Sequence, residues 1–295
     1  MTWHSAAMST IQIATDSPAL KAVHEQIWNI LSQTSLARHV ERFRPTLDGG
    51  KMLRARLILA LGSANCEPER ILIHACVAVE MLHASSLLHD DVVDGGTQRR
   101  GAPALWVSEG ARAAVILGDL LMSLAVGSIQ DALPDRIPLL VDTFREMCEA
   151  EAEQEFSLLG DDASWARCLS IARRKTGSLF GFAAACTGGD DTRLTEALRQ
   201  AGYAIGTAYQ LADDLLDTSP DPTAADKTLG TDQLTGKLTA ASAAPDDAPP
   251  IPAFIDSLLL DAQNTLAPWP PALQACQAYI ADHLAPLIAC YLGGT

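Results

Sequence analysis

The spacing of apolar residues constrains the fold of this chain more than any other feature. From about Ser17 to Gly206 they recur at steps of three and four, and strict two-residue alternation is nearly absent. The segment ERILIHACVAVEMLHASSLLHDDVV is apolar on most of its faces, as expected of a helix in the middle of a bundle. Low aromatic content, 5%, also favours helices packed on helices. The pattern predicts an all-α protein.

The remaining sequence divides into a loop and two further helical segments. Residues 218–252 are rich in Pro, Ala, Asp and Gly, which is typical of a long functional loop or lid. Residues 253–266 and 271–292 are predicted to be helical. There is no repeat period that would indicate a solenoid. We therefore expect a single domain over residues 1–295, with its motifs between about 45 and 240.

The charge of the chain excludes one class of partner. The formal net charge is −15, and no long run of Lys or Arg offsets it locally. Because binding to nucleic acid requires a basic surface, we expect no nucleic-acid partner. An acidic protein can still bind anionic substrates through local cation clusters or through metal ions held on carboxylates.

Cysteines and termini indicate a cytoplasmic protein. The seven cysteines are scattered and form no CxxC pair, so neither a zinc site nor a disulfide framework is predicted. The start MTWHSAAMST lacks the features of a signal peptide. No run approaches the roughly 18 uninterrupted apolar residues of a membrane span. We expect a cytoplasmic protein without a stable membrane span.

Two acidic motifs share one spacing. Each places three aspartates in a DDxxD pattern after an apolar helical segment: Asp90, Asp91 and Asp94 in the first, and Asp213, Asp214 and Asp217 in the second. Aspartates four residues apart lie on one face of a helix, where their repulsion weakens the helix unless they bind a cation. A single motif could be a solvated helix end. Two such motifs predict facing helices that hold Mg²⁺ between them.

Cationic residues accompany both motifs. They are Lys51 and Arg54 after Gly49 and Gly50, Arg99 and Arg100 after the first motif, Lys175 beside Thr176, and Lys227 and Lys237 after the second motif. Glycines at a helix start expose N–H groups that favour an anion. Each cation alone is typical of a solvated surface. Together they predict two diphosphate sites, one held through metal and one held directly, and hence a reaction of two apolar diphosphates.

Five segments resemble one known family. GGKMLRARL, MLHASSLLHDDVVDGGTQRRG, RRKTGSLFG, GTAYQLADDLLD and KTLGTDQLTGKLT resemble the trans-isoprenyl diphosphate synthases, or polyprenyl synthetase family. The resemblance implies a single orthogonal helical bundle around a deep central cavity, the isoprenoid synthase type. It also implies a homodimer that condenses isopentenyl diphosphate with an allylic diphosphate into an all-trans product.

The resemblance also implies residue roles. Asp90, Asp94 and Asp213 would bind magnesium, about three ions with the diphosphate, and Asp91, Asp214 and Asp217 would support that cluster. The allylic diphosphate would contact Arg99, Lys175, Thr176, Gln210, Lys227 and Lys237. The isopentenyl diphosphate pocket would contain Gly50, Lys51, Arg54, His83 and Arg100. From its position alone, His83 is better interpreted as a core histidine.

The implied reaction begins with ionisation of the allylic C–O bond, followed by attack of the isopentenyl double bond and loss of a proton. Magnesium and Lys175 would stabilise the leaving diphosphate. The alternatives are a terpene cyclase and a regulatory subunit of a heteromeric synthase. The chain departs from the family pattern at Asp226 and Thr235, in a shortened stretch after Lys237, and in lacking a basic C-terminus.

Small residues before the first motif predict a long product. Family members that make short products carry a bulky aromatic four or five residues before the first Asp, whereas this chain has Ser85 and Ser86. Met81 and Leu82 lie one level deeper, and the flexible Met81 could form a late floor. We expect roughly six to ten isoprene units, about C30–C50, if the product follows the helix at its 1.5 Å rise per residue. A geranylgeranyl or farnesyl synthase is the alternative. In another alternative, Ser85 only packs against a neighbouring helix and the floor is set elsewhere, for instance near Leu121 and Met122. Release of a long product would involve transient membrane contact.

Overall fold

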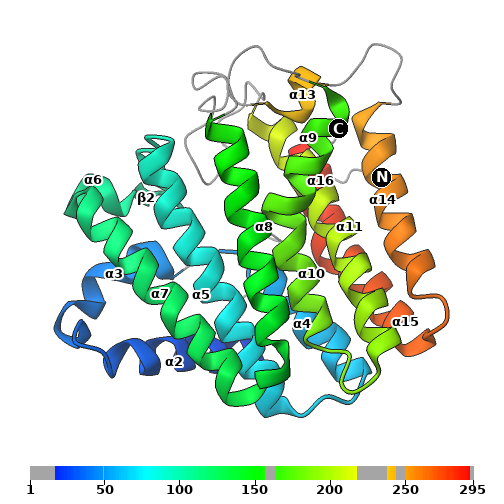
Figure 1. The fold of residues 1–295 in the computed structure, drawn as a ribbon, viewed down its shortest axis with the longest axis horizontal. Helices are drawn as coiled ribbons and strands as arrows, with labels where there is room; N and C mark the ends of the chain where they lie inside the picture. Colours follow the sequence, from blue (N-terminus) through cyan, green and yellow to red (C-terminus); the bar gives the residue numbers. More distant parts are fainter. Residues whose placement is uncertain (1–16, 49, 157–163, 218–237, 244–249, 293–295) are drawn as a thin grey trace, which may run out of the picture.

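The computed structural model describes residues 17–48, 50–156, 164–217, 238–243 and 250–292, and these ranges are almost entirely helical (Figure 1). The α-helices are α2 (Pro18–Ser32), α3 (Val40–Leu47), α4 (Leu53–Ala64), α5 (Glu69–Val93), α6 (Leu105–Glu109), α7 (Ala111–Ala132), α8 (Ile137–Phe156), α9 (Trp165–Ala172), α10 (Ser178–Ala185), α11 (Thr192–Asp217), α13 (Ala240–Ala243), α14 (Ile251–Thr265), α15 (Pro270–Tyr279) and α16 (Ala285–Tyr291). Short 3₁₀ turns η1 (Ala37–His39) and η2 (Pro134–Arg136) connect some of them.

Helix boundaries follow local sequence signals. Proline begins α2 and α15, where its missing N–H costs no hydrogen bond. The long α5 ends at Val93 with Asp94 as its C-cap, and Gly95 beyond it has a φ of 67°, a conformation that glycine adopts without strain. The predicted helices 253–266 and 271–292 correspond to α14 and to α15–α16. The predicted lid overlaps helix at α13 and at the start of α14, while residues 218–237 and 244–249 lie outside the described ranges.

Two hydrophobic cores share helices α4 and α10. One core joins α4 and α10 to α11 and to α14–α16, and it includes Leu57 and Phe180. The other joins the opposite faces of α4 and α10 to α2, α5, α7 and α8, and it includes Ile58 and Phe182. In Figure 1 the helices α7, α5, α8, α10, α11 and α14 follow one another from left to right in one bundle, and α2 lies beneath α5. This is the all-helical architecture that the periodicity predicts.

Two irregular elements lie within this helical frame. The segment η3 (Arg173–Gly177) is a single π-helical turn between α9 and α10, and η5 (Ile280–Leu284) is another between α15 and α16. Isolated π-turns of this kind are frequent at functional sites. The only strands in the described ranges are β1 (Gln98–Arg99) and β2 (Ala102–Pro103), which pair as an antiparallel hairpin. Arg100 and Gly101 form its turn with φ of 54° and 74°, as a two-residue hairpin requires.

Two helices are long and apolar enough, by composition, to cross a membrane. They are α5 and α7, and their most apolar windows are 56% and 39% buried inside the protein. A core helix of a folded bundle meets the same criterion, so the finding is weak evidence for a span. Helix α5 also ends in aspartates, which are costly in lipid.

Candidate active site

A cavity of about 370 Å³ opens between the ends of the central helices. Most of the residues singled out in the sequence line it: Gly50, Lys51, Arg54, His83, Ser85, Ser86, Asp90, Asp91, Asp94, Arg99, Arg100, Lys175, Thr176, Gln210, Asp213 and Asp214. They come from α4, α5, the β-hairpin, η3 and α11. The fold therefore brings both acidic motifs and two groups of cations onto one cavity.

The first acidic motif divides into two kinds of carboxylate. Asp90 lies in the last turn of α5, and Asp94 caps the helix with its N–H donating to the Asp90 carbonyl. Asp91 instead is buried, at 2% exposure, and accepts a hydrogen bond of 2.5 Å from Nη2 of Arg99. Burial raises the pKa of Asp91, and Arg99 opposes that shift. In this structure Asp91 and Arg99 thus form an ion pair with each other. The sequence interpretation had assigned Asp91 to the metal site and Arg99 to the allylic diphosphate.

The second acidic motif is connected to two other elements by hydrogen bonds. Thr176 of η3 donates to Oε1 of Gln210 at 2.5 Å, and Nε2 of Gln210 donates to Asp214 at 2.7 Å. The other carboxylate oxygen of Asp214 accepts from the Ala240 N–H at 2.9 Å. Asp213 lines the cavity, whereas Asp217 is buried and does not line it. Asp214 therefore links α11 to the short helix α13.

Lys175 occupies the π-turn η3 and faces the first acidic motif. Its Nζ donates to Oε1 of Gln154 at 3.1 Å and forms an ion pair with Glu151. Burial lowers the pKa of Lys175, but Asp90, Glu151 and Asp94 outweigh it and raise the pKa above its ordinary value. The ammonium therefore stays protonated at neutral pH and places a positive charge on the cavity wall.

Helix α8 contributes acidic residues that the sequence interpretation missed. Carboxylate oxygens of Asp94, Glu151 and Glu155 lie within 4.8 Å of one another, the only such group of potential metal ligands in the described ranges. Carboxylate oxygens are the ligands that Mg²⁺ prefers. The four-residue spacing of Glu151 and Glu155 in EAEAEQEF was the available signal, because it places both on one helical face.

A second cation group, formed by Lys51, Arg54 and Arg100, also lines the cavity. Arg54 is buried and stacks over the ring of Phe180 at 4.5 Å, and burial lowers its pKa while Glu80 raises it. Gly50 lies directly against the Arg100 side chain, since a Cβ at position 50 would lie 2.7 Å from Nη2 of Arg100. The φ of 102° at Gly50 is likewise available mainly to glycine. The GGKxxR and RRG segments therefore meet in space.

His83 and Glu80 lie beside these cations. Burial holds the pKa of His83 well below its usual range, and Arg54, Arg100 and Arg99 lower it further. Its imidazole is therefore neutral at physiological pH. Glu80, which the sequence interpretation missed, accepts the N–H of Ala55 at 3.0 Å, and burial raises its pKa while Arg54 lowers it. Glu80 thereby orients the start of α4, which carries Arg54.

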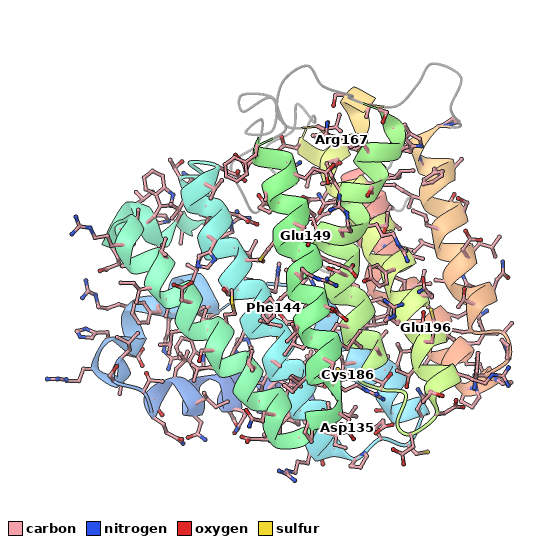
Figure 2. All side chains as sticks on the ribbon, viewed as in Figure 1. Asp135, Phe144, Glu149, Arg167, Cys186 and Glu196 are labelled. Atoms are coloured by element: carbon pink, nitrogen blue, oxygen red, sulfur yellow. The ribbon has the colours of Figure 1, made fainter. Side chains whose placement is uncertain are left out.

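The deeper part of the cavity is apolar. Leu82 of α5, Met122 of α7, Phe144 and Met147 of α8, and Leu179 of α10 line it. Phe144 lies seven residues before Glu151, or roughly 10 Å along α8 at the helical rise, and Figure 2 shows it lower on that helix than Glu149.

The three residues predicted to set product length lie in two different places. Ser85 and Ser86 line the cavity, but the Ser85 hydroxyl also donates to the Gly118 carbonyl of α7 at 2.8 Å. Met81 instead lines a separate small void of about 30 Å³, with Leu121. At the level where the sequence places both Met81 and Leu82, Leu82 therefore lines the cavity and Met81 does not. Lys227 and Lys237 lie outside the described residues.

Comparison with known proteins gives concordant results. A family model described as polyprenyl synthetase matches residues 40–244. A probable farnesyl diphosphate synthase of Sinorhizobium fredii is 32% identical over 265 residues, which are 81% of this chain and 78% of that protein. A nonaprenyl diphosphate synthase of Mycobacterium tuberculosis is 30% identical over 195 residues, 65% of this chain and only 58% of that protein. The crystal structure of a decaprenyl diphosphate synthase from Rhodobacter capsulatus shares the fold, with a TM-score of 0.77 at 24% identity, covering 90% of this chain and 95% of that one.

Proposed function

Because this chain belongs to the polyprenyl synthetase family of prenyltransferases, we propose that it joins isopentenyl diphosphate to an allylic diphosphate. The match confirms the family resemblance, and the helical fold agrees with it. One observation carries the proposal: two acidic motifs and two separate cation groups line one cavity with an apolar interior. An enzyme that binds a single diphosphate substrate needs only one of the two cation groups.

The allylic diphosphate binds between the two acidic motifs in this proposal. Asp90, Asp94 and Asp213 would hold magnesium, about three ions with substrate bound, and Glu151 adds a further carboxylate near Asp94. Magnesium, when bound, neutralises the diphosphate and stabilises it as a leaving group. Lys175 contributes a fixed positive charge at the same place. Thr176 and Gln210 orient that end of the cavity.

Isopentenyl diphosphate binds at the second cation group. Lys51, Arg54 and Arg100 supply the charge, and the neutral His83 can donate or accept a hydrogen bond without adding charge. The apolar walls around Leu82 and Leu179 surround the isoprene chains and keep water away from the ionised allylic carbon. Long-chain products follow from the small Ser85 and Ser86 at the cavity wall.

A single assay separates this function from its alternatives. The purified chain, given isopentenyl and farnesyl diphosphates with Mg²⁺, should release inorganic diphosphate and longer prenyl diphosphates, and EDTA should abolish both. A hydrocarbon formed from farnesyl diphosphate alone would indicate a terpene cyclase. Turnover that requires an added partner subunit would indicate a regulatory component.

The quaternary state and location form part of the proposal. We propose a cytoplasmic homodimer that pairs through α7, whose Val115 and Ile116 are 40% and 65% exposed. Sedimentation should give twice the monomer mass, and Ile116→Asp should shift it to the monomer. Membrane contact would then be transient, during release of a long product.

A further inference from the structure

Three aromatic rings connect the two cations of the GGKxxR segment. Nζ of Lys51 lies 5.5 Å from the ring centre of Tyr291, and Tyr291 lies 6.1 Å from the ring of Tyr209. Tyr209 is in turn 6.1 Å from Phe180, over which Arg54 stacks at 4.5 Å. Cations over aromatic faces and tilted ring pairs are both favourable contacts. Lys51 and Arg54 therefore lie at the two ends of one continuous row.

The row is assembled from three helices distant in the sequence. Phe180 belongs to α10, Tyr209 to α11 and Tyr291 to α16. Tyr291 is only 6% exposed and packs in the core that α16 shares with α11. It also lines the cavity, together with Lys51, Arg54 and Tyr209. Helix α16 thus forms part of the wall where we place isopentenyl diphosphate.

Tyr291 also forms a directed bond to Lys51. Nζ of Lys51 donates to the Tyr291 hydroxyl at 3.0 Å. A lysine ammonium has three N–H donors, so the bond to Tyr291 does not by itself saturate it. Lysine has a flexible stem with high rotamer entropy, and a buried hydroxyl that restrains it lowers the cost of ordering it on binding.

We propose that Tyr291 is a positioning residue for isopentenyl diphosphate, because its ring and hydroxyl hold the Lys51 ammonium toward the cavity. The inference rests on the proposed function, which assigns Lys51 to that substrate. It adds a role for α16, a helix that none of the sequence motifs reaches. The packing of α16 against α11 therefore helps to form the isopentenyl diphosphate site.

The decisive variant is Tyr291→Phe, which removes the hydroxyl and keeps the ring. Loss of a hydrogen bond to a charged group should raise the KM for isopentenyl diphosphate by about tenfold. The KM for farnesyl diphosphate and kcat should stay within about twofold, since uniform binding to one substrate is what is lost. Calorimetric titration of isopentenyl diphosphate should show the same loss of affinity without turnover.

A matched control is Tyr279→Phe. Tyr279 is a buried tyrosine in the preceding helix α15 whose hydroxyl donates to the Leu53 carbonyl at 3.1 Å, and it does not line the cavity. Its variant should lose stability while keeping both KM values. A rise in the isopentenyl KM of equal size in both variants would reduce Tyr291 to a packing residue and overturn the inference.

Lys51→Met completes a double-mutant cycle. It should raise the isopentenyl KM by itself, and Tyr291→Phe should add nothing further in that background, because the two act through one ammonium. Additive effects, or a lower KM in Tyr291→Phe because the hydroxyl competes with the diphosphate, would refute the positioning role. If Lys51→Met left the isopentenyl KM unchanged, the assignment of the pocket itself would fail instead.

Discussion

At the scale of single residues, the aspartates of the two acidic motifs differ in how deeply they are buried. Asp91 and Asp214 are buried and hydrogen-bonded to Arg99 and Gln210, so they fix the ends of α5 and α11. Asp90 and Asp213 line the cavity at intermediate exposure. We therefore expect different consequences from substituting the two kinds of aspartate.

Asp90→Asn and Asp213→Asn should each lower kcat by several orders of magnitude, because each removes a carboxylate that would hold magnesium on the leaving diphosphate. Steady-state assays at saturating Mg²⁺ measure the effect, and circular dichroism should show an unchanged melting profile. Asp142→Asn is the control, since Asp142 is an exposed residue of α8 that pairs with Arg145. Near-normal activity in either cavity variant would refute the magnesium placement.

At the scale of elements, glycines allow α11 to approach α10 and η3 closely. Gly202 and Gly206 are four residues apart on α11, and Gly177 and Gly181 are four apart on the facing segment. A Cβ on Gly202 would lie 2.4 Å from the Phe180 carbonyl oxygen, a contact with backbone that no side-chain rotation relieves. This approach holds Thr176 within hydrogen-bond reach of Gln210.

Gly202→Ala should therefore destabilise the protein by about 2 kcal/mol or more, as overpacking of a tight helix contact does. Urea unfolding followed by circular dichroism measures the change. Gly127→Ala on α7 is the matched control, because no described atom beyond the adjoining residues and backbone of its own helix lies within 4 Å of the added Cβ. Its greater helix propensity should stabilise the protein by up to about 1 kcal/mol. Equal effects in the two variants would contradict the close approach of α10 and α11.

At the scale of the whole molecule, product length depends on how α5, α7, α8 and α10 together close the apolar end of the cavity. Ser85 and Ser86 leave space along α5, while Leu82, Met122 and Phe144 line the deeper part. The space available to a growing chain is thus a property of four helices rather than of one motif.

Ser85→Phe should shorten the products to about three or four isoprene units with activity retained, since a ring there fills the cavity roughly one helical turn from Asp90. Chromatography of the dephosphorylated products measures the distribution. Ser85 also contacts Gly118 of α7, so Ser86→Phe serves as a second variant without that contact. Ser257→Phe on the exposed face of α14 should change nothing. Unaltered products in both cavity variants would reject α5 as the limit.

The sequence alone determined the helical class and most of the candidate site. Apolar periodicity is a local property that a helix expresses wherever it packs, so α5 and α11 could be predicted from it. The DDxxD, GGKxxR and RRG segments carry their chemistry at fixed local spacings, and the fold brings them together. Lys227 and Lys237, in the predicted lid, stay a prediction from the sequence.

Only the tertiary structure decided which side chains face one another. Tyr291 lies 240 residues from Lys51, and Glu151 reaches Lys175 and Asp94 from another helix, so no local spacing reports either contact. Leu82 rather than Met81 faces the cavity because the rotation of α5 about its axis is set by its packing against α7. Such contacts depend on how helices cross and how closely they approach, and periodicity along one helix contains neither quantity.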